Sequence, residues 1–182
     1  MRRLSLVILI SLIIISCGSC SNKYKKLLQT DNAPFLGPVF RDFLIAYCEA
    51  DGDGVLSMLS QEDLDWHIAY YNQSKKEKSK GRGDDPYYAQ HSSSYEEFFQ
   101  KCLAREQSLR TQNGMISVEK TTRYSLAGLR LLDEKALSDK GELHYKVFQK
   151  ENIHTIGFKQ ESGKWKICGI RILSKFEATL QE

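Results

Sequence analysis

The hydrophobic pattern of this chain changes along its length. Apolar residues first dominate the stretch from Leu4 to Ile15. After a polar stretch they recur at the 3.6-residue period of helices, and from Met115 they alternate with polar residues as in strands. Helices before strands predict an α+β fold, with N-terminal helices packed on a curved antiparallel sheet.

Three amphipathic helices are predicted in the first half of the chain. The first opens at Gly37 before a proline and ends at the turn-rich stretch 51–54. Capping boxes beginning at Ser60 and Ser94 predict two more, separated by a long polar loop over 72–93. The residues expected to be buried on these helices are Phe40, Leu44, Tyr47, Cys48, Leu64, Ile68, Tyr71, Phe98, Cys102 and Leu109.

Period-two alternation predicts the strands of the second half. The stretches that carry it are 116–118, 124–126, 129–131, 143–147 and 154–158, and a last strand over 165–172 is apolar on both faces. His154 shares its strand face with Ile156 and Phe158, so we expect its imidazole to point inward.

The N-terminus has the layout of an export signal. Met1-Arg2-Arg3 is positively charged, and the apolar run after it is too short for a stable membrane span. Ile14-Ile15-Ser16-Cys17 resembles the bacterial lipoprotein box, which implies removal of residues 1–16 and attachment of lipid to Cys17. Cys20 is a poorer site, and an ordinary signal or an uncleaved anchor is the alternative. The absence of Asp after Cys17 favours the outer membrane, with the protein facing the periplasm.

The remaining chain divides into three parts by composition. Residues 17–34 are polar and predict a lipidated tether, 35–175 carry the domain, and 176–182 form a tail. Loss of the two signal-peptide arginines lowers Lys+Arg from 26 to 24, against 23 acidic residues, which argues against a nucleic-acid partner. The basic run 75–82 predicts a solvated loop, with contact to an anionic lipid or a partner as the alternative.

The cysteines leave two interpretations open. Export permits disulfides, and Cys20, Cys48, Cys102 and Cys168 allow three pairings. Because the last three lie in apolar patterns, buried free thiols are the alternative.

The order of motifs resembles that of NTF2-like domains, the cone-shaped α+β roll. The matching features are the first helix, the Asp51-Gly52-Asp53 break, the apolar stretch 55–60 and the closing segment Gly163-Lys164-Trp165-Lys166-Ile167. The resemblance covers roughly 36–173 and implies a pocket between sheet and helices, used by relatives for isomerase or dehydratase chemistry or for binding. It also implies that a homodimer through the outer sheet face is possible. No position matches a catalytic motif of the family.

Three groups of residues are candidates for a site. The aromatic segment from Trp66 to Phe99 suits a pocket wall or an interface, with ordinary packing of two helices as the alternative. Its candidate residues are Trp66, Tyr70, Tyr87, Tyr88, Tyr95 and Phe99, of which Tyr87 and Tyr88 are the best, because packing explains them less well. An inward His154 could serve as an acid or base. Residues Glu49–Ser60 resemble a calcium loop but carry Ser at its last position, so a plain turn between helices is the better interpretation.

The sequence therefore favours a membrane-tethered envelope lipoprotein that binds a partner protein or a small apolar ligand, without catalysis and without metal or cofactor. The alternatives are a pocket enzyme using His154 and a calcium-binding module at Glu49–Ser60.

Overall fold

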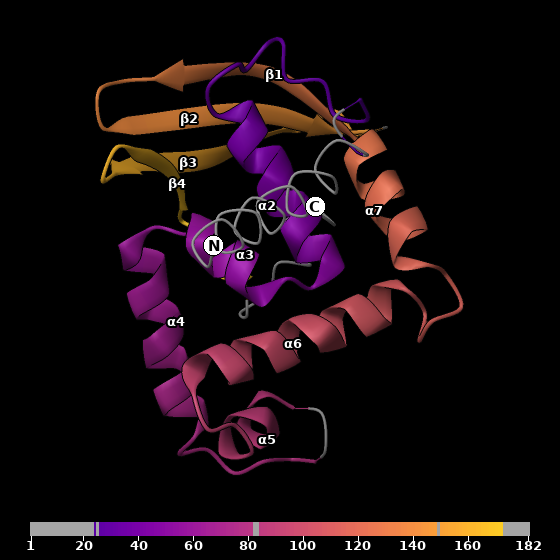
Figure 1. The fold of residues 1–182 in the computed structure, drawn as a ribbon, viewed down its shortest axis with the longest axis vertical. Coiled ribbons are helices and arrows are strands. Elements are labelled where there is room, and N and C mark those ends of the chain that lie inside the picture. The colour runs from indigo at the N-terminus through magenta and orange to yellow at the C-terminus, as the bar shows by residue number, and fades with distance from the viewer. Residues whose placement is uncertain (1–23, 25, 82–83, 149, 173–182) are drawn as a thin grey trace, which may run out of the picture.

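The structure, a computed structural model, describes residues 24, 26–81, 84–148 and 150–172. The predicted signal peptide, Cys17, Cys20 and the predicted tail lie outside these residues. Helices come first and a sheet second, so the predicted α+β class is confirmed (Figure 1). None of the helices in the described part is both long enough and apolar enough to cross a membrane.

Six described helices precede the sheet. They are α2 (Gly37–Glu49), α3 (Gly52–Met58), α4 (Gln61–Ser74), α5 (Asp85–Gln90), α6 (Tyr95–Arg110) and α7 (Val118–Ala127). Five of them begin at a side chain that accepts a hydrogen bond from the backbone N–H three residues later; these caps are Asp51, Ser60, Asp84, Ser94 and Ser117. The helix starts predicted at Ser60 and Ser94 are confirmed.

The strands after α7 form an antiparallel meander. They are β1 (Leu129–Ala136), β2 (Lys140–Val147), β3 (Ile153–Glu161) and β4 (Lys164–Cys168). Their order in the sheet is β1-β2-β3-β4, so β1 and β4 are its two edges. Helix α2 packs against one face of the sheet, where Phe40 meets Tyr145 of β2 with ring centroids 5.1 Å apart.

One carboxylate fixes the start of α2 to β1. The backbone N–H of Phe35 donates to Oε1 of Glu134 at 2.9 Å, and that of Leu36 donates to Oε2 at 2.6 Å. N–H groups at the start of a helix have no partner within the helix, and a negative charge suits the positive end of the helix dipole. Glu134 therefore holds the N-terminus of α2 over the sheet.

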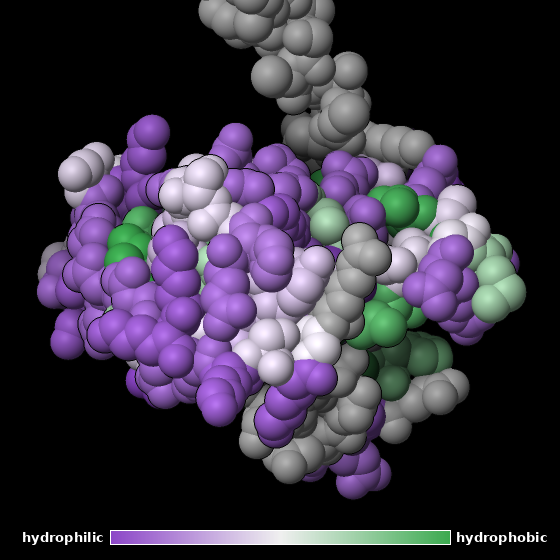
Figure 2. All heavy atoms as spheres, turned by 90° about the horizontal axis from the view of Figure 1, so that it is seen from below, coloured by the Kyte–Doolittle hydropathy of each residue, from purple (hydrophilic) through white to green (hydrophobic). Residues whose placement is uncertain are grey.

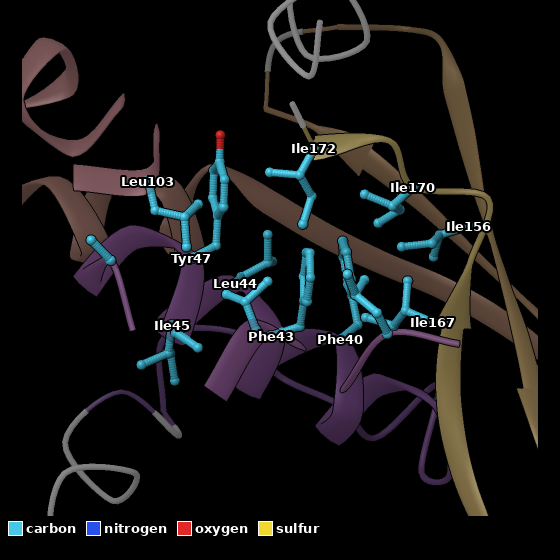
Figure 3. Close-up of a cluster of buried hydrophobic side chains, with 14 of the residues drawn as sticks. Phe40, Phe43, Leu44, Ile45, Tyr47, Leu103, Ile156, Ile167, Ile170 and Ile172 are labelled. Atoms are coloured by element: carbon cyan, nitrogen blue, oxygen red, sulfur yellow. The ribbon is translucent and has the colours of Figure 1, made fainter. Parts of the chain in front are cut away.

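The core lies between α2 and the sheet. Figure 3 shows side chains of α2 pointing toward those of β3, β4 and the segment after β4, among them Phe40, Phe43, Ile156, Ile167, Ile170 and Ile172. Phe98 and Phe99 of α6 extend this core and are fully buried. The predicted burial of Phe40, Leu44, Tyr47, Cys48, Tyr71, Phe98 and Cys102 is confirmed.

Two predicted elements are wrong. The stretches 116–118 and 124–126, predicted to alternate as strands, lead into α7 and lie within it, because Thr122 and Leu126 are buried one helical turn apart and Ser117 caps the helix. Part of the predicted loop 72–93 is helical. Asp84 caps α5, and Pro86 falls in the first turn of this helix, where proline is tolerated.

Helix α4 turns a different face inward from the one predicted. Ile68 is 39% exposed, whereas Asp63 and His67 are buried. Asp63 is tolerated inside because it accepts hydrogen bonds from the Ser60 hydroxyl at 3.0 Å and the Gly169 N–H at 2.9 Å. Leu109, in the last turn of α6, is likewise exposed rather than buried.

The domain also begins earlier and its last strand ends earlier than predicted. Tyr24, Leu28 and Ala33 fall within the predicted tether 17–34, yet all three are buried in the core. β4 ends at Cys168, and the buried residues after it continue the core without strand pairing.

Candidate functional site

A groove lies beside β4, at the edge of the sheet. Its volume is about 600 Å³, and it is lined by Pro38, Val39, Asp42, Ser57, Met58, Lys164, Trp165 and Lys166. These residues come from α2, the end of α3 and β4. The groove therefore combines apolar surface with two lysines and one acid.

The backbone of β4 is only partly paired on this side. Ser60 donates its N–H to the carbonyl oxygen of Ile167 at 2.8 Å, in a short parallel bridge between Leu59 and Ile167. Successive residues of a strand direct their backbone groups to opposite sides, so Trp165 directs its N–H and C=O to the same free side as Ile167. In the described chain no strand pairs with this end of β4.

The charges around the groove are mostly positive and partly unpaired. Glu161, the cross-strand partner of Lys164, accepts hydrogen bonds from the N–H of Gln61 at the start of α4 instead. Lys164 is exposed and forms no ion pair with any described residue. Lys166 donates to the carbonyl oxygen of Ser57, and Asp42 is bound to Arg41 at 3.0 Å. Lys164 is thus the free cation of the groove among the described residues.

The aromatic candidates of α4 and α6 lie close together, but not at this groove. Trp66 stacks on Tyr70 with centroids 5.4 Å apart, and Tyr95 packs against Phe99 at 5.9 Å. Tyr95 and Phe99 are buried. Seen from the α5 and α6 side, the molecule is covered mainly by hydrophilic side chains, with its hydrophobic ones in separate areas (Figure 2). This cluster is therefore chiefly part of the packing between helices.

Tyr87 and Tyr88 are held by α5 rather than presented by a loop. The ring of Tyr87 stacks on His91 at 4.2 Å, and Tyr88 packs against the core with the Arg105 guanidinium 5.8 Å from its ring centroid. Both tyrosines are half-buried. Both therefore have contacts within the described chain, and an interaction role for them stays a prediction.

A polar cluster joins α4, α5 and α6 below these rings. Asp85 accepts a hydrogen bond from the Tyr70 hydroxyl at 2.6 Å and forms an ion pair with Arg105 at 2.8 Å. Burial is the largest cause that raises the pKa of Tyr70, and the hydrogen bond to Asp85 and the charge of Asp85 follow. The phenol therefore stays protonated and acts as a hydrogen-bond donor. Burial and the Asp85 charge likewise raise the pKa of the Cys102 thiol. A neutral phenol and a neutral thiol make poor nucleophiles, so this cluster holds α5 in place.

His67 is a neutral core residue. Its Nδ1 lies 2.6 Å from the Asp63 carbonyl oxygen, which makes Nδ1 the protonated nitrogen. Nε2 is buried with no hydrogen-bond partner in the described part of the molecule, and the ring lies edge-on to Phe99 at 5.7 Å. Burial lowers the pKa of His67, which keeps the imidazole uncharged.

His154 points inward, as its strand parity predicts. It lies opposite Tyr145 on β2, and the two rings stack at 5.3 Å. Its Nε2 is buried and has no hydrogen-bond partner in the described chain. The geometry thus gives His154 a ring neighbour but no described carboxylate to form an acid–base pair.

The segment proposed as a calcium loop is helical. Asp51 caps α3 by accepting from the Gly54 N–H at 2.9 Å, and α3 continues to Met58. The residues of Glu49–Ser60 therefore form a helix-to-helix turn and a helix instead of a twelve-residue loop. Among the described residues no three His, Cys, Asp or Glu side chains gather as metal ligands.

The three described cysteines are free thiols. Cys48 and Cys102 are buried and Cys168 is half-buried. This favours the free-thiol interpretation for these three; Cys20 lies outside the described residues.

The groove was missed from the sequence because its parts are distant along the chain. In the sequence, Trp165 and the apolar residues near Met58 have the pattern of ordinary core positions. The available signal is a tryptophan between Lys164 and Lys166 in the closing strand, since an amphipathic aromatic residue between cations is typical of an exposed edge.

Comparison with protein-family models, curated proteins and solved structures found no match to this chain. The structure itself establishes an α+β protein in which helices precede a four-stranded antiparallel sheet.

Proposed function

We propose that this protein is a lipoprotein of the bacterial cell envelope whose α+β domain binds an extended, acidic segment of a partner protein beside β4, without catalysis. The single observation that carries the binding role is the groove of about 600 Å³ at the partly unpaired edge of β4. An extended peptide can add to a free sheet edge through main-chain hydrogen bonds, while side-chain pockets supply specificity.

The shape and charge of the groove suit such a segment. Trp165 exposes its backbone N–H and C=O along the edge, and Val39 and Met58 offer apolar contact. Lys164 supplies an unpaired positive charge beside them. A segment that alternates apolar and acidic residues would place its apolar side chains in the groove and a carboxylate near Lys164.

The arrangement of ionisable groups supports binding over catalysis. The enzyme alternative requires His154 to work with an acid or a tyrosinate at a cavity. Its nearest ring, Tyr145, has a pKa raised by burial, so the phenol is neutral. The space between α2 and the sheet is filled by side chains such as Phe40 and Ile156 (Figure 3).

The family and the location are also part of the proposal. Helix α2, the break at Asp51, and Trp165 in a closing strand occupy the order expected of an NTF2-like domain. Lipid on Cys17 would anchor the domain, and we place it at the outer membrane facing the periplasm. Lys140 and Lys159 lie directly opposite each other on the outer sheet face, and their repulsion opposes a homodimer through that face. We therefore expect the partner to be a different protein.

A library of displayed linear peptides, selected on the full-length protein, tests the binding role. We expect enrichment of peptides that alternate acidic and apolar residues, and roughly tenfold weaker binding to Lys164→Glu, since reversal of one charge replaces attraction by repulsion. Lys78→Glu, an equal charge change at an exposed residue away from the groove, is the matched control.

Two results would contradict the role. One is a library with no enriched peptides. The other is a small apolar molecule that native mass spectrometry detects on the wild type but not on Trp165→Ala; it would support ligand binding in the groove instead.

A further inference from the structure

A second surface, at the end of the sheet next to α7, carries exposed apolar side chains among cations. Phe148 is 72% exposed and Ile153 is 60% exposed. Phe148, Arg130 and Lys146 line one small hollow of about 170 Å³. We call Arg130, Lys146, Phe148 and Ile153 the α7-end patch.

The strand register places the members of this patch side by side. Lys146 of β2 lies between Arg130 of β1 and Ile153 of β3, as the direct cross-strand partner of both. Phe148 follows β2 immediately, and its N–H donates to the Gly128 carbonyl oxygen at 2.5 Å, which ties it to the start of β1. The three paired residues share the outer face of the sheet.

The two cations of the patch lack anionic partners within the described chain. Arg130 and Lys146 are directly opposed, and like charges in that position repel each other. Neither forms an ion pair with a described residue, and the next acid on this face, Asp133, is engaged by His144 at 2.5 Å. An external anion would relieve this repulsion.

The start of the domain lies at the same end of the sheet. Lys26, Leu27 and Leu28 line a hollow of about 300 Å³ together with Leu129, Arg130 and Leu131. Figure 1 shows the indigo N-terminal segment running beside β1. Tyr24 is already buried in the core, so the domain is attached to whatever precedes it at this point.

The distance to the proposed anchor is short. Six residues lie between Cys17 and Tyr24, and a fully extended chain spans at most about 25 Å over these seven steps. A domain of this size is roughly 40 Å across. If Cys17 carries lipid, the bilayer surface is therefore within reach of the α7-end patch, whereas the α5 end of the domain lies much farther from the attachment point.

We infer that the α7-end patch is a membrane-contacting surface that docks the domain on an anionic bilayer. Phe148 and Ile153 enter the headgroup region, and Arg130 and Lys146 contact lipid phosphates. The inference rests on the proposed lipidation of Cys17, but not on peptide binding at β4. It also orients the domain, because the β4 groove lies at the opposite edge of the sheet from β1.

The test uses the full-length lipidated protein reconstituted into vesicles that contain a photoactivatable diazirine lipid. The vesicles are phosphatidylcholine alone or phosphatidylcholine mixed with phosphatidylglycerol, and adducts are mapped by mass spectrometry. We expect adducts on Phe148 and Ile153, but not on Leu137 or Met115, which are apolar residues elsewhere that are at least as exposed. The yield should rise with phosphatidylglycerol and fall with salt.

Charge reversal gives the matched comparison. One cation at an anionic surface contributes about fivefold to association, so Arg130→Glu with Lys146→Glu should lower the phosphatidylglycerol-dependent yield by about thirtyfold or more. The same double change at Lys76 and Lys78, both exposed and distant from the patch, should leave it unchanged.

The outcomes separate the anchor from the patch. Protein that floats with the vesicles but gives adducts equally on Leu137 and Met115, or yields that do not respond to Arg130→Glu and Lys146→Glu, would overturn the patch and leave the anchor intact. Protein that carries no lipid on Cys17 would overturn both the anchor and this inference.

Discussion

The backbone N–H of Ser60 donates to the carbonyl oxygen of Ile167 at 2.8 Å, and among the described residues this is the one bridge that covers the outer edge of β4. Two residues earlier, Trp165 directs its own N–H and C=O to the same side, where the groove begins. Exposed sheet edges are ready-made templates for pairing with another chain. The half-covered edge is the structural basis of the proposed binding role.

Removal of the carboxylate at Glu134 should destabilise the protein. Glu134→Ala leaves the N–H groups of Phe35 and Leu36 without their acceptor, and the loss of charge-assisted hydrogen bonds predicts a decrease of about 2 kcal/mol in the free energy of unfolding. Urea denaturation measures it. Glu142→Ala, at an exposed position of β2, is the control, and an equal effect of the two would contradict the role given to Glu134.

Replacement of His67 should flatten the dependence of stability on pH. Burial lowers the pKa of His67 below its ordinary 6.5, so just below that pH the unfolded chain binds more protons than the folded one. Stability should therefore fall as pH drops through 6.5, by at most about 1.4 kcal/mol per pH unit for one group. His67→Asn should lose this dependence, whereas His91→Asn, at an exposed residue, should keep it.

The contributions of His67 and Asp63 to the pH dependence of stability can be told apart. Burial raises the pKa of Asp63 above 3.8, so the folded state holds its proton more readily and stability falls as pH rises through that lower window. This sign is opposite to that of His67. Denaturation of His67→Asn that retains the full wild-type slope near pH 6.5 would contradict the assignment.

Loss of the Tyr70 hydroxyl should loosen α5. Tyr70→Phe removes the hydrogen bond to Asp85 at 2.6 Å and should cost about 1 to 2 kcal/mol of unfolding free energy. Tyr87→Phe is the matched control, because the Tyr87 hydroxyl makes no hydrogen bond to a described residue. If both variants are as stable as the wild type, the Asp85 cluster does not hold α5 in the way described.

A better turn residue at Ser162 should stabilise the β3–β4 hairpin. Ser162 and Gly163 both have positive φ, 50° and 75°, as in the two-residue turns that favour Asn followed by Gly. Ser162→Asn should raise the melting temperature slightly, with a gain of about 0.5 to 1 kcal/mol, and Ser162→Val should lower it, since a β-branched residue is strained at positive φ. Changes of the opposite sign would contradict this turn geometry.

Local signals in the sequence predicted much of the fold. The caps at Ser60 and Ser94 depend on neighbouring residues, so these helix starts could be predicted directly. Alternation misled the prediction for α7, whose apolar residues Val118 and Leu126 fit a helical face as well as strand positions.

Features that depend on tertiary contacts could not be predicted. His67 and Asp63 are polar, and nothing near them in the sequence shows that Gly169 and Phe99 would accommodate them in the core. The groove likewise requires Val39 and Trp165 to meet across more than a hundred residues. Several aromatic residues chosen as interaction candidates have ring partners within the described chain, such as Tyr70 against Trp66 and Phe99 against Tyr95, and an interaction role for them stays a prediction.

The most direct test of the binding role is amide hydrogen exchange of the full-length protein with and without a selected acidic peptide. Strand addition predicts marked slowing of exchange at the Trp165 amide, which faces the groove, and little change at Lys164 and Lys166, whose amides face β3. Unchanged exchange at Trp165 in the presence of saturating peptide would contradict binding at the β4 edge.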